Sequence, residues 1–387
     1  MEKVKLSDII QETITGEWGT DIKKDENDVY VIRTADFCND GTINYDKVEK
    51  RNIAEKKIKE KSLVIGDIII EKSGGTDKNP VGRVVLFDKE NYKCLANNFT
   101  QVLRVKNEYY YKYIFYQLFY KYKCGATLQM FNQTTGIQNL QMKIYLNQKL
   151  NTYIKEEQIE IANKLDKVQE IIGIRKKQIE ELDELIKSQF VEMFEEKEFP
   201  KIAIKDFADV RAGGTPDRKN KTYWENGNIP WIKTGEVKEN LIVESEEYIT
   251  ELGLENSSAV LFDVGTILVA MYGQCLTRGR CAKLGIKATT NQACAGINIY
   301  DNKVINDYLF YYLQIKYEEL RNLGLGGVQP NLNSKMIKEF EVILPPIELQ
   351  NDFVKKIKLI DKQKFEIQKS LEEMQKLQES LMNKYFG

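Results

Sequence analysis

Histidine is entirely absent from this sequence of 387 residues. The commonest general base and the commonest zinc ligand are therefore missing, which argues against much of ordinary enzyme chemistry. The six cysteines include no C-x-x-C pair, and a chain of this length needs no disulfide staples. We expect reduced and mostly buried thiols in a cytoplasmic protein.

Long apolar runs and a large net charge are missing as well. The most apolar stretches, LVIGDIII (63–70) and GTILVAMYG (265–273), fall far short of the ~18 residues of a membrane span, so we expect buried strands and no membrane partner. The charged start, MEKVKLSDII, does not resemble a signal peptide. The net charge of −1 argues against a non-specific polyanion binder, so a basic patch must be created by folding.

Motifs of DNA-modifying enzymes are not found. A base methyltransferase needs Asn or Asp followed by two prolines and an aromatic residue. The only such proline pair, Pro345-Pro346, lies between a leucine and an isoleucine and suits the start of a helix. No G-x-x-x-x-G-K-[ST] phosphate loop occurs, so an ATP-driven motor is not expected.

The sequence does contain one pattern that occurs twice. QIEIANKLDKVQ (158–169) and QNDFVKKIKLID (350–361) lie 192 residues apart, and both have apolar residues at the four-then-three spacing of a helix with one apolar face. The colinear matches upstream are VIRTADF (31–37) with WIKTGEV (231–237), VIGDIII (64–70) with DVGTILV (263–269), GRV (82–84) with GRC (279–281), YIFYQL (113–118) with YLFYYL (308–313), and GIQNL (136–140) with GVQPNL (327–332). The repeating unit is one globular domain followed by one long helix.

Within each repeat, short β-rich runs alternate with turn residues and precede one aromatic, helix-like segment. This pattern predicts an α+β fold with two globular domains and two long helices. The aromatic segment at 109–122 could be a base-stacking platform, but its counterpart keeps helical spacing, which favours a packing helix. The predicted boundaries are 1–152 for the first domain, 153–197 for a central spacer helix, 198–345 for the second domain and 346–387 for a C-terminal spacer helix.

Two variable domains, each followed by a near-identical helix, resemble the specificity subunit of type I restriction-modification systems, which serve host defence. The stretch GGTP (213–216), followed by IPWIKTGEV (229–237), is similar to the opening of such a subunit's target recognition domain. The first domain departs from this pattern, with GEWGTD (16–21) where the second has AGGTPD (212–217). Its opening loop therefore need not follow the family geometry.

The resemblance implies a fold and a function together. Two target recognition domains would be separated by two long antiparallel coiled-coil helices in a pseudo-twofold tandem repeat, and each domain would read half of a split double-stranded DNA target. The chain would be non-catalytic and without a cofactor. Its partners would be two modification subunits, which bind S-adenosylmethionine and methylate adenine, and two restriction and translocase subunits. A coiled coil suits this task because readers one DNA turn apart, about 34–36 Å, need a fixed separation.

DNA recognition requires phosphate contacts for position and base-edge contacts for specificity, and loop polar residues beside glycines are the natural candidates. No catalytic or metal-binding residue is predicted. Arg278 and Arg280 are the most attractive, because a glycine-flanked arginine pair can contact O6 and N7 of guanine. The predicted DNA-binding residues are Arg33, Thr34, Lys72, Ser73, Lys78, Arg83 and Gln138 in the first domain, and Lys233, Thr234, Tyr272, Gln274, Arg278, Arg280 and Gln329 in the second.

Two other interpretations remain open at this point. One is a coiled-coil scaffold whose globular repeats bind protein, which predicts no sequence-dependent DNA binding. The other is a stand-alone nuclease that uses acidic residues and a metal. Glu71 and Lys72 near Asp67 loosely resemble a nuclease cluster, but the Glu-x-Lys spacing is missing.

Overall fold

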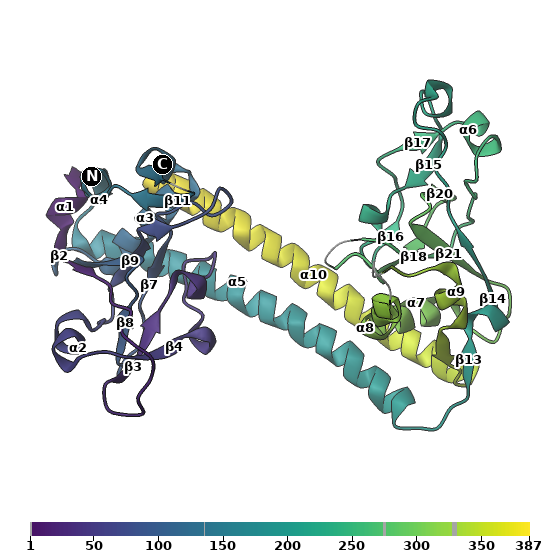
Figure 1. The fold of residues 1–387 in the computed structure, drawn as a ribbon, viewed down its shortest axis with the longest axis horizontal. Coiled ribbons are helices and arrows are strands. Elements are labelled where there is room, and N and C mark those ends of the chain that lie inside the picture. The colour runs from purple at the N-terminus through teal and green to yellow at the C-terminus, as the bar shows by residue number, and fades with distance from the viewer. Residues whose placement is uncertain (1, 135, 274–275, 327–330) are drawn as a thin grey trace. The chain divides into compact units, whose positions relative to one another are not determined.

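The computed structural model describes residues 2–134, 136–273, 276–326 and 331–387, and the chain forms two compact units (Figure 1). Unit 1 comprises Met1–Lys176 and Lys369–Gly387, and unit 2 comprises Lys177–Gln368. Each unit contains one globular domain and a part of each long helix, α5 (Lys155–Phe190) and α10 (Ile347–Phe386). The predicted α+β tandem fold is confirmed.

The long helices begin and end where the sequence signals a change. The α5 helix has 36 residues and passes into a π-helical turn, η4 (Val191–Glu195), shortly before Pro200. The α10 helix has 40 residues and starts after the proline pair. At 1.5 Å per residue, the two helices are about 54 and 60 Å long.

The secondary structure of unit 1 is mostly short strands with one substantial helix before α5. The helices are α1 (Leu6–Ile9), α2 (Glu55–Lys61), α3 (Tyr111–Lys123), α4 (Met142–Leu146) and the 3-10 turn η1 (Thr34–Asp36). The strands are β1 (Glu2–Lys5), β2 (Ile10–Thr15), β3 (Asp28–Ile32), β4 (Glu49–Asn52), β5 (Ile68–Glu71), β6 (Ser73–Gly74), β7 (Val84–Leu86), β8 (Cys94–Ala96), β9 (Thr100–Val105), β10 (Phe131–Thr134), β11 (Ile137–Leu140) and β12 (Lys149–Thr152).

The core of unit 1 lies on both faces of the antiparallel sheet β2-β9-β5-β7. Alternation along β5 explains this, since Ile69 packs toward the second sheet, β4-β3-β8, while Ile68 and Ile70 pack in the cluster that contains α3 and the long helices. In the second sheet, β3 pairs in parallel with β8. Tyr113 of α3 is fully buried in the cluster, so the prediction of a packing helix is confirmed.

Unit 2 has a similar set of elements in the same order. The helices are α6 (Glu251–Glu255), α7 (Asn306–Ile315), α8 (Tyr317–Asn322), α9 (Ser334–Glu339) and the 3-10 turn η7 (Thr234–Glu236). The strands are β13 (Lys201–Ala203), β14 (Ala208–Ala212), β15 (Ile229–Ile232), β16 (Leu241–Ile242), β17 (Tyr248–Ile249), β18 (Ile267–Ala270), β19 (Cys281–Leu284), β20 (Thr289–Thr290), β21 (Cys294–Ile299) and β22 (Glu341–Ile343).

The topology of unit 2 repeats that of unit 1. Its main sheet has the order β14-β21-β18-β19-β16, which matches β2-β9-β5-β7 with one added edge strand. Its second sheet has the order β17-β15-β20, and β15 pairs in parallel with β20 as β3 does with β8. The first strand of each domain pairs with its last, β1 with β12 and β13 with β22. The colinear matches at 31–37, 64–70, 82–84 and 113–118 are therefore structural equivalences, whereas the match of 136–140 falls mostly on residues outside the described ones.

Within each unit the two long helices run antiparallel, as predicted. In unit 1, Gln378 donates to Gln169 at 2.5 Å, and Lys164 lies beside Tyr385. In unit 2, the end of α5 contacts the beginning of α10, with Lys364 bound to Asp183 at 2.5 Å and Lys356 to Gln189 at 3.1 Å. None of the helices in the described ranges combines the length and apolarity needed to cross a bilayer.

Candidate nucleic-acid interface

The predicted residues of unit 1 come from three segments that meet in one loop cluster. Arg33 and Thr34 follow β3, the loop between β5 and β7 carries residues 72–83, and Gln138 lies on β11. Arg83 Nη2 donates to the carbonyl of Thr34 at 3.0 Å, and β6 pairs with β11. We call this the unit 1 loop cluster.

Gln138 is a structural member of that cluster. Its side chain is 2% exposed, and its Oε1 accepts a hydrogen bond from the amide of Val81 at 3.2 Å. Ser73 Oγ donates to the side chain of the neighbouring Asn139. The two polar residues therefore shape the loop that carries the exposed Lys78.

The two arginines of this cluster are held by carboxylates. Arg83 pairs with Glu71 at 2.6 Å, and that carboxylate side chain is only 3% exposed. Arg33 pairs with Asp36 at 3.0 Å and with Glu49 at 2.5 Å, and the hydrogen bond to Asp36 is the main reason why its pKa is raised. DNA contact by either guanidinium would have to compete with these partners.

Lys72 differs from the arginines. Across the described ranges, no carboxylate forms an ion pair with its ammonium group. Burial lowers the pKa of Lys72, and the nearby positive charge of Lys61 lowers it further. A partly buried cation without an anion is the group in this cluster best suited to bind a phosphate.

The loops of unit 2 occupy the equivalent places. Lys233 and Thr234 follow β15, as Arg33 and Thr34 follow β3. Lys233 pairs with Glu246 at 2.7 Å and with Glu247 at 3.2 Å, and these hydrogen bonds, Glu246 first, raise the pKa of Lys233.

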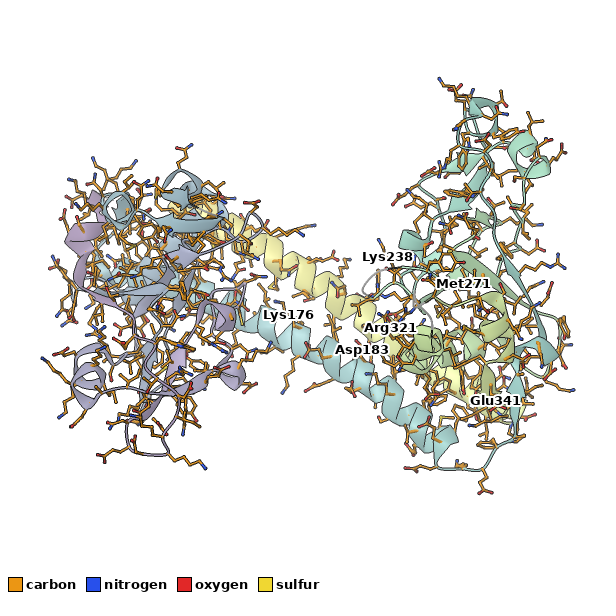
Figure 2. All side chains as sticks on the ribbon, viewed as in Figure 1. Lys176, Asp183, Lys238, Met271, Arg321 and Glu341 are labelled. Atoms are coloured by element: carbon orange, nitrogen blue, oxygen red, sulfur yellow. The ribbon has the colours of Figure 1, made fainter. Side chains whose placement is uncertain are left out.

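The loop between β18 and β19 carries the remaining described candidates of unit 2. Tyr272 is exposed, Arg278 is buried, and Arg280 is 32% exposed. Arg321 of α8 is labelled in Figure 2. It donates to the carbonyl of Arg278 at 3.1 Å, which ties this part of the loop to that helix. The predicted residues Gln274 and Gln329 lie outside the described residues.

Sequence reasoning missed an asparagine that occupies the same position in both domains. The backbone amide of Asn97 donates to the carbonyl of Ile32 at 2.9 Å, and the backbone amide of Asn291 donates to the carbonyl of Ile232 at 3.1 Å. Asn291 also accepts from Thr234 Oγ1 at 3.1 Å, within the predicted site. The signal was available, because each asparagine directly follows the strand that runs parallel to β3 or β15.

Phe99 also belongs to the unit 1 loop cluster. Its side chain is 46% exposed, and its carbonyl accepts from the amides of Lys72 and Ser73 at 2.9 and 3.1 Å. An exposed aromatic ring in this loop cluster can stack on a base or sugar.

The described residues contain no cluster of three His, Cys, Asp or Glu side chains placed to hold a metal ion. Burial raises the pKa of Cys94 to about 12 and that of Cys294 to about 12. These thiols stay protonated at neutral pH and are poor nucleophiles.

The chain matches the family described as type I restriction modification DNA specificity domain twice, at residues 1–184 and 196–377. It is similar to the type I restriction enzyme MjaIX specificity subunit of Methanocaldococcus jannaschii, with 24% identity over 368 residues that cover 87% of this chain and 81% of the relative. It is also similar to the EcoR124I/EcoR124II specificity subunit of Escherichia coli, with 28% identity over 145 residues, 37% of this chain and 36% of that one. The crystal structure of a type I restriction-modification S subunit from M. genitalium has the same fold, with a TM-score of 0.62 at 16% identity over 100% of this chain and 96% of the other.

Proposed function

Because this chain belongs to the type I restriction-modification DNA specificity family, we propose that its two domains each read one half of a split DNA sequence and that the chain directs methyltransferase subunits to it. The observation that carries the proposal is the repetition of one loop arrangement in both units. An arginine-containing loop joins β5 to β7 in unit 1, and an equivalent arginine-containing loop joins β18 to β19 in unit 2. The family is the specificity subunit and not the catalytic one, so the chemistry belongs to partners.

The loop residues divide into three proposed groups. Lys72, Lys78 and Arg280 have side chains that can reach phosphates or base edges. Arg33, Arg83 and Lys233 are ion-paired with carboxylates. To bind DNA, each would have to release its carboxylate partner. Gln138 and Arg278 are buried and would act by shaping their loops.

We further propose that residues 1–152 and 198–345 are the two readers, and that 153–197 and 346–387 are the spacer helices. Antiparallel pairing of α5 and α10 in each unit makes a stiff support. Such a spacer would hold the readers about one DNA turn apart, roughly 34–36 Å, and so set the distance between the half-targets.

Exposed apolar residues on the helices support partner binding. Ile171 and Ile174 on α5 are exposed in unit 1, and in unit 2 Leu185 on α5 and Leu359 and Phe365 on α10 are exposed, the last of these 67%. We propose that these solvent-facing helix positions contribute to the surfaces that bind the partner proteins. The proposed partners are two methyltransferase subunits, which would bind S-adenosylmethionine, and two restriction and translocase subunits. A protein-binding scaffold and a stand-alone nuclease have no support from the family assignment.

The experiment that tests the proposal is a map of methylated adenines in host DNA with and without this gene. A split motif with a constant spacer that disappears with the gene is expected. If every methylated motif were still present without the gene, the proposal would be contradicted.

The spacer role has a separate test. Four residues inserted after Lys176 and after Gln368 lengthen both helices by ~6 Å, close to two base pairs at ~3.4 Å each. We expect the methylated motif to gain a longer spacer with unchanged half-targets. The control is the same four residues in the exposed turn at 88–91. If the lengthened chain still directed methylation only to targets with the original spacer length, the spacer role would be refuted.

A further inference from the structure

The two domains dock on the long helices through the same contacts. In unit 1, Gln158 of α5 accepts a hydrogen bond from the amide of Tyr110 at 2.9 Å. In unit 2, Gln350 of α10, 192 residues further on, accepts from the amide of Ile305, also at 2.9 Å. These bonds align α3 with α7 and α5 with α10 residue by residue.

A second shared contact fixes the same alignment. Tyr113 OH donates to the carbonyl of Asn151 at 2.8 Å, and Tyr308 OH donates to that of Ile343 at 2.8 Å. Both tyrosines are fully buried. The tyrosine contact lies within each domain, between α3 and β12 or between α7 and β22, whereas the glutamine contact joins domain and helix. Because the glutamine contact is alike in the two units, it would accept either domain on either helix.

One contact in this alignment is reversed in charge. Lys112, just before Tyr113, pairs with Asp166 of α5 at 2.6 Å. Asp307, just before Tyr308, pairs with Lys358 of α10 at 2.5 Å. Asp166 and Lys358 are equivalent, because each lies eight residues after its docking glutamine. The domain side is therefore positive in unit 1 and negative in unit 2.

We propose that this reversed ion pair is a position code, by which each globular domain docks on the helix that follows it in the chain and not on the other. If the domains were exchanged, Lys112 would face Lys358 and Asp307 would face Asp166. The side chains of Lys112 and Asp166 are each 31% exposed and that of Asp307 is 21% exposed, so water screens the repulsion between Asp307 and Asp166 only in part. The side chain of Lys358 is 59% exposed, so its repulsion of Lys112 is screened more.

The neighbouring side chains hold one of these ion pairs in place and reduce the expected repulsion at the other. Tyr116 OH also donates to Asp166, at 2.6 Å, which keeps that carboxylate in place. Lys283 also pairs with Asp307, and it would travel with Asp307 in an exchange. Burial raises the pKa of Asp307, but hydrogen bonds from Lys283 and Lys358 outweigh this and leave the pKa lowered. Both exchanged junctions are therefore weakened in part, that of Lys112 with Lys358 by solvent and that of Asp307 with Asp166 by Lys283.

The first test reverses charges in the intact chain. K112D/D307K changes only the domain side, and D166K/K358D changes only the helix side, so both make like-charged junctions. We expect each double variant to lower the midpoint of thermal unfolding by about 2–4 °C. The fourfold variant should recover part of this loss and not all of it, because D307K also removes the carboxylate that Lys283 pairs with. A fourfold variant no more stable than the double variants would overturn the proposal.

Two controls separate the pair from its surroundings. K177E/E181K reverses an exposed ion pair within α5, 3.5 Å long, and should leave the midpoint unchanged. Y116F removes the tyrosine hydrogen bond to Asp166 without a change of charge. If Y116F accounted for the whole effect of D166K while K112D had none, the ion pair would carry no code.

The second test exchanges the domains, with 198–345 in place of 1–152 and the reverse. D166K/K358D should stabilise this exchanged chain while it destabilises the natural order. The proposal is contradicted if D166K/K358D shifts the midpoint of thermal unfolding in the same direction in both chains. It is also contradicted if the exchanged chain without helix changes is as stable as the natural one. If the exchanged chain does not fold without these changes, recovery by D166K/K358D supports the proposal and failure to recover counts against it. None of these measurements involves DNA, so they are independent of the proposed function.

Discussion

The loop between β5 and β7 in unit 1 and the loop between β18 and β19 in unit 2 occupy the same place, yet they hold their arginines differently. The amide of Glu71 donates to the carbonyl of Arg83, and the amide of Ala270 donates to that of Arg280, both at 2.9 Å. Arg83 and Arg280 are therefore equivalent. In unit 1 the position beside the arginine is a buried glutamate, and in unit 2 it is an alanine.

This one difference changes what each arginine can do. Arg83 is bound to Glu71 at 2.6 Å, whereas among the described residues the carboxylate paired with Arg280 is Glu239, at 3.9 Å and 43% exposed. A guanidinium with a buried carboxylate partner belongs to the fold, while one with a distant and solvated partner can turn toward DNA. Repetition of a motif thus conserves position without conserving role.

The largest effect is expected from removal of the carboxylate in unit 1. Glu71→Ala leaves Arg83 without its partner, and we expect the free energy of unfolding of unit 1 to fall by about 2–3 kcal/mol, less than for a fully buried pair because Arg83 is 18% exposed. Hydrogen exchange of the amides in β5 and β9 measures this. E71A/R83A should recover part of the loss, and unchanged exchange in E71A would mean that the pair does not stabilise the loop.

An effect of similar or smaller size is expected on DNA binding in unit 2. Arg280→Ala should weaken specific binding by about 1–3 kcal/mol, with one base position relaxed if the guanidinium reads a base and an even loss across sequences if it holds phosphate. Fluorescence anisotropy on a set of singly altered targets distinguishes these outcomes. Arg83→Ala is the matched control and should change stability more than specificity. Unchanged affinity and salt dependence in R280A would remove this residue from the interface.

The smallest effect concerns Lys72 and pH. In the protein without DNA, burial and the positive charge of Lys61 lower the pKa of Lys72 below the ordinary lysine value of 10.5. A bound phosphate would raise this pKa. DNA binding should therefore take up a proton, and affinity should fall as pH rises through the lowered pKa, while the stability of the free unit rises over the same range. Binding assays from pH 7 to 10 measure the slope. Lys72→Arg should bind with a flatter slope, and an equal slope in both proteins would exclude Lys72 as the cause.

Much of the fold was predictable from local patterns. The helical spacing repeated after 192 residues predicted two equivalent helices, and the match of GRV (82–84) with GRC (279–281) predicted the equivalence of Arg83 and Arg280. The aromatic segment before each helix was predicted to pack, and Tyr113 and Tyr308 are buried. These predictions succeed because apolar periodicity depends on neighbours along the chain.

The candidate site was only partly predictable. Residue type and nearby glycines led to Arg33, Arg83 and Gln138, but the first two are ion-paired and the third is buried. Their partners lie elsewhere in the chain, so side-chain chemistry alone did not distinguish a free cation from a neutralised one.

The sequence by itself determined that this protein consists of two equivalent halves, with a long helix after each domain, because the spacing of apolar residues encodes helices and their buried faces. Only the tertiary structure decided which polar residues remain available and which are neutralised. The pair of Lys112 with Asp166 joins residues 54 positions apart, and that of Arg83 with Glu71 forms across a folded loop. Electrostatic interactions depend on distance and burial in space, and both are defined only after the chain has folded.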